Sequence, residues 1–258
     1  MDFNTLDKQM RRFEQSIDRT ILEGTYIVAR LDGHGFSRLT EKEWSLEKPF
    51  DIRFHEAMTA TLKHLMLCGF HTMYGYTQSD EISLLFHLDE DRFGRKERKL
   101  ISILSAEASV AFSTHIGHMA VFDCRLVPLP NIDYVIDYFR WRQEDSHRNS
   151  LNAHCYWLFR KEGISANNVQ KRIAGLSIEE RNELLFSHGI NYNDLPMWQR
   201  RGIGAYFIDK EKVGYNPVTK AQNVCVRRSL FVENELPIGE EYADFIQSLI
   251  KKNSHARQ

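Results

Sequence analysis

One stretch near the N-terminus decides the fold, Tyr26-Ile27-Val28-Ala29-Arg30-Leu31-Asp32-Gly33-His34-Gly35-Phe36, because an apolar run there ends in an acid and a glycine-rich turn. The β-rich residues over 25–31 predict a buried strand. A second stretch begins with acids and continues as an apolar strand, Gln78-Ser79-Asp80-Glu81-Ile82-Ser83-Leu84-Leu85-Phe86. If the two strands are neighbours, Asp32 and Asp80 reach one rim of one sheet.

The segments around these strands follow a recognisable order. Apolar residues at helical spacing predict helices over 49–68 and 95–115, and short β-rich runs predict strands over 71–78, 82–86 and 119–127. The order β-α-β-β-α-β predicts an α+β fold with a ferredoxin-like, palm-like core. In that fold the first and third strands are antiparallel central neighbours, which places Asp32 and Asp80 at the same end.

The remaining segments predict an extension packed on this palm. We expect helices over 5–20, 132–161, 166–187 (two short ones) and 239–252, and strands over 203–209 and 222–232 joined by a turn at Gly214–Pro217. No internal repeat or clear linker is visible. The prediction is a palm-like catalytic core over 1–130 and a helical and β extension over 131–258, together forming one compact unit.

Composition limits the class of protein. The 258 residues are 42% hydrophobic with a net charge of −1, which is ordinary for a globular protein and unlike a dedicated nucleic-acid coat. The four cysteines lie far apart without a C-x-x-C pair, which argues against a thiolate zinc site. A polar N-terminus and the lack of a long apolar run predict a cytoplasmic protein without a signal peptide or membrane span.

The paired acids indicate a two-magnesium phosphoryl-transfer site. Mg²⁺ prefers oxygen ligands, and two ions can hold the attacking and leaving oxygens together. The structural alternatives are that Asp32 caps a turn and that Ser79-Asp80-Glu81 is only a polar hairpin tip. Adjacent strand residues point to opposite faces, so Asp80 is chosen as the metal ligand and Glu81 as a residue that orients it.

Two further segments carry cations. Arg95, Lys96 and Lys99 begin a predicted helix, where cations and free N–H groups could offset the charge of a triphosphate; otherwise the segment is a solvated turn. Residues 137–152 combine aromatic and basic side chains that suit RNA contacts. From pattern alone, a core helix with a structural His147 explains that stretch better.

Taken together, these motifs resemble the tRNA-histidine guanylyltransferase family, including its prokaryotic relatives that act as reverse (3′-to-5′) polymerases. The resemblance covers roughly residues 5–230 and rests on an ordered set of short motifs. In chain order they are Arg30–Phe36, Lys48-Pro49-Phe50-Asp51, Gln78–Glu81, Phe122-Asp123-Cys124-Arg125, Trp141-Arg142-Gln143 and Ile190-Asn191-Tyr192-Asn193.

The resemblance implies addition of nucleotides, GTP by preference, to the 5′ end of tRNA after activation by ATP. It implies two Mg²⁺ held by Asp32, Asp80 and the backbone of Gly33, with Glu81 as a further catalytic residue. The expected nucleotide contacts are Asp32, Gly33, His34, Gly35, Phe36, Lys48, Ser79, Asp80, Arg95, Lys96 and Lys99. The expected tRNA contacts are Arg142, His147, Asn149, Arg181, Arg200 and Arg201. The family also suggests a homo-oligomer, a tetramer or a dimer.

One motif departs from the eukaryotic pattern. The sequence H-I-N-N-L-Y-N becomes His147-Arg148-Asn149-Ser150-Leu151-Asn152-Ala153, so the final asparagine is lost. This difference resembles the prokaryotic branch and favours templated repair of truncated tRNA 5′ ends over strict addition of one G to tRNA(His). Two alternatives stay open: a palm-type nucleotide cyclase, which needs no tRNA, and a non-catalytic RNA-binding module, which needs no acids.

Overall fold

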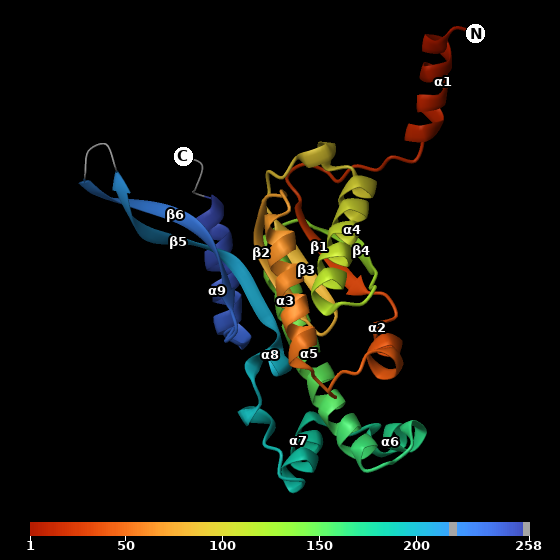
Figure 1. Cartoon of the computed structure of the whole chain (residues 1–258), viewed down its shortest axis with the longest axis vertical. Coiled ribbons are helices and arrows are strands. Elements are labelled where there is room, and N and C mark those ends of the chain that lie inside the picture. Colours follow the sequence, from red (N-terminus) through yellow and green to blue (C-terminus); the bar gives the residue numbers. More distant parts are fainter. Residues whose placement is uncertain (217–220, 255–258) are drawn as a thin grey trace.

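The computed structural model describes residues 1–216 and 221–254 and contains one six-stranded antiparallel sheet (Figure 1). The strand order is β4-β1-β3-β2-β5-β6. The strands are β1 (Tyr26–Gly33), β2 (Thr72–Gln78), β3 (Glu81–Phe86), β4 (Phe122–Leu129), β5 (Ile203–Asn216) and β6 (Ala221–Glu233). The first four form the predicted ferredoxin-like palm, with β1 and β3 as its antiparallel central pair.

Helices and short turns of helix connect and cover the strands. In chain order they are α1 (Phe3–Gln15), α2 (Phe36–Arg38), η1 (Leu39–Glu43), α3 (Ile52–Leu67), η2 (Arg92–Arg95), α4 (Glu97–Ile116), α5 (Ile132–Lys161), α6 (Ala166–Ile173), α7 (Ile178–Ser187), η3 (Tyr192–Asp194), α8 (Met197–Arg201) and α9 (Gly239–Ser254). Asp51 and Asn131 cap the first turns of α3 and α5, respectively, with their side-chain oxygens.

Alternation along β1 builds a hydrophobic core on each face of the sheet. Ile27, Ala29 and Leu31 face the core that α3 and α4 cover. Tyr26 and Val28 face the second core, which α5 and α9 complete. Because successive strand residues point to opposite faces, the even-numbered Asp32 belongs to the side of α5.

The second half of the chain continues the same sheet and adds a helical cluster. β5 pairs with β2 from Tyr74↔Tyr206 to Thr77↔Ile203, and the Tyr74 and Tyr242 hydroxyls are 3.0 Å apart in the core beneath α9. The C-terminal part of α5 packs with α6, α7 and η3 in a third, smaller core around Cys155 and Leu185. The extension therefore shares its main core with the palm.

Several predicted boundaries differ from the structure. β4 continues through Pro128 to Leu129, which an edge strand tolerates because the missing N–H faces no partner strand. The β5–β6 ladder continues to Asn216, so Gly214 is in a strand rather than a turn, and Pro217 lies outside the described residues.

α1 lies apart from the rest of the molecule (Figure 1), and none of its residues is buried. Its apolar side chains, among them Phe3, Leu6, Met10 and Phe13, are exposed. All four cysteines are free thiols. Within the described residues, no helix combines the length and apolar character needed to cross a membrane.

Candidate active site

Asp32 and Asp80 meet at one rim of the sheet, as the predicted topology requires. Asp32 lies opposite Glu81 in the β1–β3 pair, and the N–H of Gly33 donates a 3.0 Å hydrogen bond to the Asp80 carbonyl. Burial raises the pKa of Asp80 to about 6, and the nearby charge of Asp32 adds to the effect. The two carboxylates therefore form a half-buried pair of like charges.

The glycine turn after Asp32 is shaped by one aromatic ring. A Cβ on Gly33 would lie 2.5 Å from the ring of Phe36, so glycine is required for this close approach. Phe36 is buried in an aromatic group with Trp44, Phe54, Phe112 and Phe122. The ring of Phe36, a predicted nucleotide contact, thus belongs to the core, and Phe36 also lines the cavity beside Asp80 that is described below.

The other turn residues are accessible. His34 and Gly35 are exposed, and the N–H of His34 donates to the Val121 carbonyl at 2.8 Å. Gly35 has a φ of +70°, a conformation that glycine adopts without strain. The turn leaves the side chain of His34 and the backbone of Gly35 beside the rim.

A cavity of ≈ 130 Å³ opens next to Asp80. Ser79 and Asp80 form one side of it and Lys48 another. Burial lowers the pKa of the Lys48 ammonium, which also lies 5.5 Å from the centre of the Trp157 ring. The structure thus brings four of the predicted nucleotide contacts, Phe36, Lys48, Ser79 and Asp80, together around one cavity.

An aromatic wall completes the cavity and was not predicted. The rings of His55 and Trp198 stack with centroids 4.2 Å apart, and Phe50 meets Trp198 edge to face at 6.0 Å. Burial lowers the pKa of His55 to about 4, so its imidazole is neutral at pH 7. Trp198 comes from α8 in the second half of the chain, and no signal in the sequence places it beside α3.

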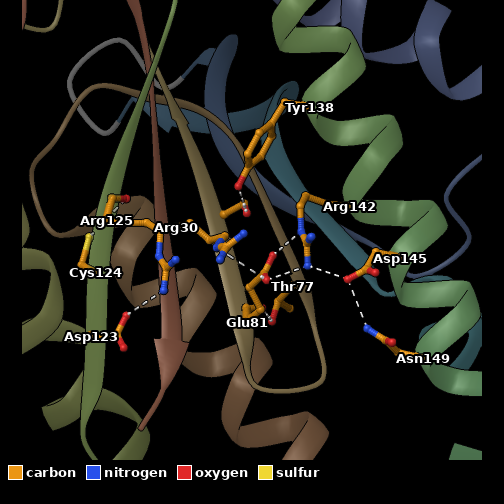
Figure 2. Close-up of polar contacts among 11 residues, drawn as sticks. Arg30, Thr77, Glu81, Asp123, Cys124, Arg125, Tyr138, Arg142, Asp145 and Asn149 are labelled. Atoms are coloured by element: carbon orange, nitrogen blue, oxygen red, sulfur yellow. Dashed lines mark hydrogen bonds and ion pairs between the residues drawn. The ribbon is translucent and has the colours of Figure 1, made fainter.

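Glu81 is turned away from the cavity and bound to arginine. Its two carboxylate oxygens accept hydrogen bonds of 2.7 Å each from Nε and Nη2 of Arg142 on α5, and Arg30 Nε lies 3.8 Å away (Figure 2). Arg142 also donates to Asp145 at 3.0 Å. The structure thus places Glu81, a predicted catalytic group, and Arg142, a predicted tRNA contact, in a buried pair with each other.

The basic segment around Arg95 is at the opposite end of the sheet. Arg95 is buried and donates to the carbonyls of Ile21, Leu88, Glu90 and Thr25, the last of which directly precedes β1. At a strand rise of about 3.3 Å per residue, Thr25 and Asp32 are roughly 20 Å apart. Within one chain, the structure therefore does not bring this segment together with the acids.

The neighbours of Arg95 have partners of their own. Lys96 Nζ is 2.9 Å from an oxygen of Asp18, and Arg98 pairs with the same carboxylate. Lys99 Nζ lies 6.0 Å from the centre of the Phe93 ring. These contacts fix the start of α4 against the segment that precedes β1.

The predicted tRNA contacts fall into two groups. Arg181 donates to the carbonyls of Leu176 and Ile173 and so ties α7 to the end of α6. Apart from Arg142, the others lie on α5 or on α8, which packs against α5. Of these, Asn149 contacts Asp145, Arg201 pairs with Glu144 at 2.9 Å, Arg200 donates to the Leu195 carbonyl, and His147 lies 3.4 Å from the Tyr192 hydroxyl.

Comparisons with known proteins agree over most of the chain. Residues 7–130 match the family model described as tRNAHis guanylyltransferase, and residues 133–247 match the model of the Thg1 C-terminal domain. A tRNA(His) guanylyltransferase of Debaryomyces hansenii is 33% identical over 198 residues, which cover 72% of this chain and 74% of the relative.

Two solved structures extend this similarity. A bacterial tRNA(His) guanylyltransferase (Thg1)-like protein in complex with ATP superposes with a TM-score of 0.75 at 27% identity, over 95% of this chain and 99% of the other. Such a protein in complex with GTP gives 0.70 at 26% identity over the same shares.

Proposed function

Because the chain belongs to the tRNA(His) guanylyltransferase family of nucleotidyltransferases, we propose that it adds nucleotides, GTP by preference, to the 5′ end of tRNA in the 3′-to-5′ direction. One observation carries the proposal: Asp32 and Asp80 meet at a sheet rim beside a cavity that also contains Lys48. The similar bacterial structures hold ATP and GTP, which supports these nucleotides as substrates.

The acid pair suits two magnesium ions. Within the part of the chain that the structure describes, no group of three or more His, Cys, Asp or Glu side chains is placed to hold a metal ion. Mg²⁺ does not require one, since it commonly uses one or two carboxylates together with waters and substrate phosphates. Burial, together with the like charge of Asp32, raises the pKa of Asp80, and a divalent cation would offset both effects, so Asp32 and Asp80, with the backbone of Gly33, fit this role.

The reaction is two successive in-line displacements. ATP first transfers its adenylyl group to the tRNA 5′-monophosphate and pyrophosphate leaves. The 3′-hydroxyl of an incoming nucleotide then attacks the activated 5′ phosphate and AMP leaves. Bound Mg²⁺ supplies stabilisation of the charge that develops on the phosphate oxygens.

The residues around the cavity bind and orient the nucleotide. Lys48 provides a cation for the triphosphate, and the exposed Ser79 hydroxyl provides a donor beside Asp80. The stacked His55 and Trp198 provide an apolar surface for a base. No nucleophilic side chain is needed, because both attacking groups belong to the substrates.

The departure at Ala153 favours templated repair of tRNA 5′ ends over strict addition of one G. We also propose a cytoplasmic homo-oligomer, a dimer or a tetramer. Two observations support an assembly: the Arg95–Lys99 segment is remote from the acids of its own chain, and the apolar residues of α1 are exposed. The free thiols of all four cysteines are consistent with a reducing compartment.

Nucleotide addition to labelled tRNA tests the proposal. The wild-type chain is incubated with ATP and nucleoside triphosphates and with two matched tRNAs, one complete and one lacking its first 5′ nucleotide. We expect extension of the shortened tRNA and none by Asp32→Ala or Asp80→Ala, both of which should remain folded. Cyclic nucleotide formation without tRNA would identify a cyclase instead, and tRNA binding without chemistry would identify a binding module.

A further inference from the structure

A third acid lies at the metal-binding rim and is held away from it. Glu81 is directly opposite Asp32 in the β1–β3 register, so both side chains leave the same face of the sheet. Opposite residues on one face of an antiparallel pair have Cβ atoms about 4.5–5.5 Å apart. A glutamate in this position is long enough to reach any cation that Asp32 binds.

Arg142 determines where the Glu81 carboxylate points. Its guanidinium binds both carboxylate oxygens at 2.7 Å, and both side chains are at least nine-tenths buried. A bidentate pair of this kind fixes the orientation of the carboxylate as well as its position. The Glu81 oxygens therefore face Arg142 on α5 (Figure 2), and Glu81 is not among the residues that line the cavity.

Arg142 is itself held in place from several directions. It donates to Asp145 at 3.0 Å and lies 4.4 Å from the centre of the Trp141 ring. One turn earlier on α5, the hydroxyl of Tyr138 is 2.9 Å from that of Ser83 on β3, which ties the helix to the strand that carries Glu81.

Arg30 does not replace this contact. Its Nε lies 3.8 Å from Glu81, too far for a hydrogen bond, and has no hydrogen-bond partner among the described residues. Arg30 contributes positive charge near Glu81, and only Arg142 provides the two-point contact.

We propose that Arg142 is a positioning residue that holds Glu81 against α5, so that the Glu81 carboxylate is not available to the catalytic cations at Asp32 and Asp80. The proposal rests on the proposed function. According to this proposal, Arg142 prevents Glu81 from binding the catalytic cations. Arg142 therefore acts on the metal site through Glu81, and not through a contact with tRNA.

Mn²⁺ binding to the full chain without tRNA or nucleotide, followed by electron paramagnetic resonance, provides a readout separate from activity. Nucleotide addition to labelled tRNA is measured in parallel on Arg142→Met, Glu81→Gln and the double variant. Arg140→Met is the matched control, because Arg140 lies on the same helix and pairs with the exposed Glu240 at 2.8 Å.

In Arg142→Met the released Glu81 adds negative charge at the rim, so we expect Mn²⁺ to bind about tenfold more tightly. Nucleotide addition should fall by about tenfold or more, because the ligand geometry for the phosphates is lost. In the double variant, the Mn²⁺ affinity and the rate of nucleotide addition should lie within about twofold of those of Glu81→Gln alone. The reason is that a neutral amide competes poorly for a hard cation. Arg140→Met should match the wild type.

Unchanged Mn²⁺ affinity in Arg142→Met, or a double variant no better than Arg142→Met, would overturn the proposal. If Arg142→Met does not fold, Arg142→Lys takes its place: Mn²⁺ binding must tighten in it and revert with Glu81→Gln. A wild-type chain that adds no nucleotide to tRNA would refute the proposed function, whereas the Mn²⁺ titration would still decide the role of Arg142.

Discussion

The backbone N–H of Gly33 donates a 3.0 Å hydrogen bond to the carbonyl oxygen of Asp80. This bond joins the end of β1 to the tip of the β2–β3 hairpin, next to both acids. The separation of the Asp32 and Asp80 backbones is therefore set by the pairing of β1 with the hairpin. Substitutions of Asp80, Gly33 and Lys48 test this rim and the cavity beside it, and a substitution of Arg95 tests the segment that lies away from it.

The crowding of the acid pair predicts a pH-dependent gain in stability for Asp80→Asn. Burial and the charge of Asp32 raise the pKa of Asp80 from 3.8 to about 6, so its ionised form is disfavoured in the folded protein. Without divalent ions at pH 8, the variant should be more stable by roughly 1–2 kcal/mol. The gain should shrink as the pH falls through 6, because the native carboxyl then binds a proton.

Thermal denaturation in EDTA at pH 8 and pH 5 measures this effect. Asp244→Asn, at an exposed position on α9, is the control and should show no such difference. A loss of stability in Asp80→Asn at pH 8 would contradict the electrostatic account of the rim.

Gly33→Ala should destabilise the protein, because the new Cβ would lie 2.5 Å from the buried ring of Phe36. Overpacking of this kind costs about 1–3 kcal/mol. Urea denaturation should show the loss, and Phe36→Leu in the same chain should recover part of it, since the smaller side chain leaves room. A double variant that is as unstable as the sum of the two single variants would exclude the predicted clash.

Arg95→Met should lower stability and leave nucleotide binding intact. The substitution removes the donors for four backbone carbonyls, which should cost roughly 3 kcal/mol. Lys63→Met, at an exposed position on α3, should cost less than about 0.5 kcal/mol. If Arg95→Met is as stable as the wild type and its KM for ATP is strongly raised, Arg95 contacts the nucleotide and the structural role is wrong.

Lys48→Met should weaken nucleotide binding with little effect on folding. Lys48 and Asp80 line the same cavity, so Lys48 provides a cation there. Loss of a charge-assisted contact to a phosphate should raise the KM for ATP by about tenfold. Steady-state kinetics on labelled tRNA measures the change, with the exposed Lys42→Met as control. An equal rise in both variants would show that the effect is general rather than local.

The palm could be predicted from the sequence because its signals are local and its topology is restrictive. Hydrophobic periodicity predicted α3, α4 and the strands around them, and the ferredoxin-like order then fixed β1 beside β3. The pairing of β1 with β3 is enough to place Asp32 and Asp80 at the same end of the sheet. Strand alternation also predicted that Asp80 and Glu81 differ in role.

Other features depend on contacts that the sequence does not encode locally. An arginine after a glycine has the same donors whether phosphates or carbonyls accept them, so Arg95 could be assigned only once its surroundings were known. The Glu81–Arg142 pair joins a strand to a helix that lies far along the chain. Trp198 reaches the cavity only because β5 adds to the sheet beside β2 and brings α8 with it.

The uninterrupted pairing of β1 with β3, from Val28↔Leu85 to Asp32↔Glu81, restricts how natural versions of this protein can vary in length. Inserting or deleting one residue within β1 would send Asp32 to the side of α3 and α4 and expel Leu31 from its core. Homologous sequences should therefore accumulate such length changes in the loops and never between Tyr26 and Asp32, however far their other residues have diverged.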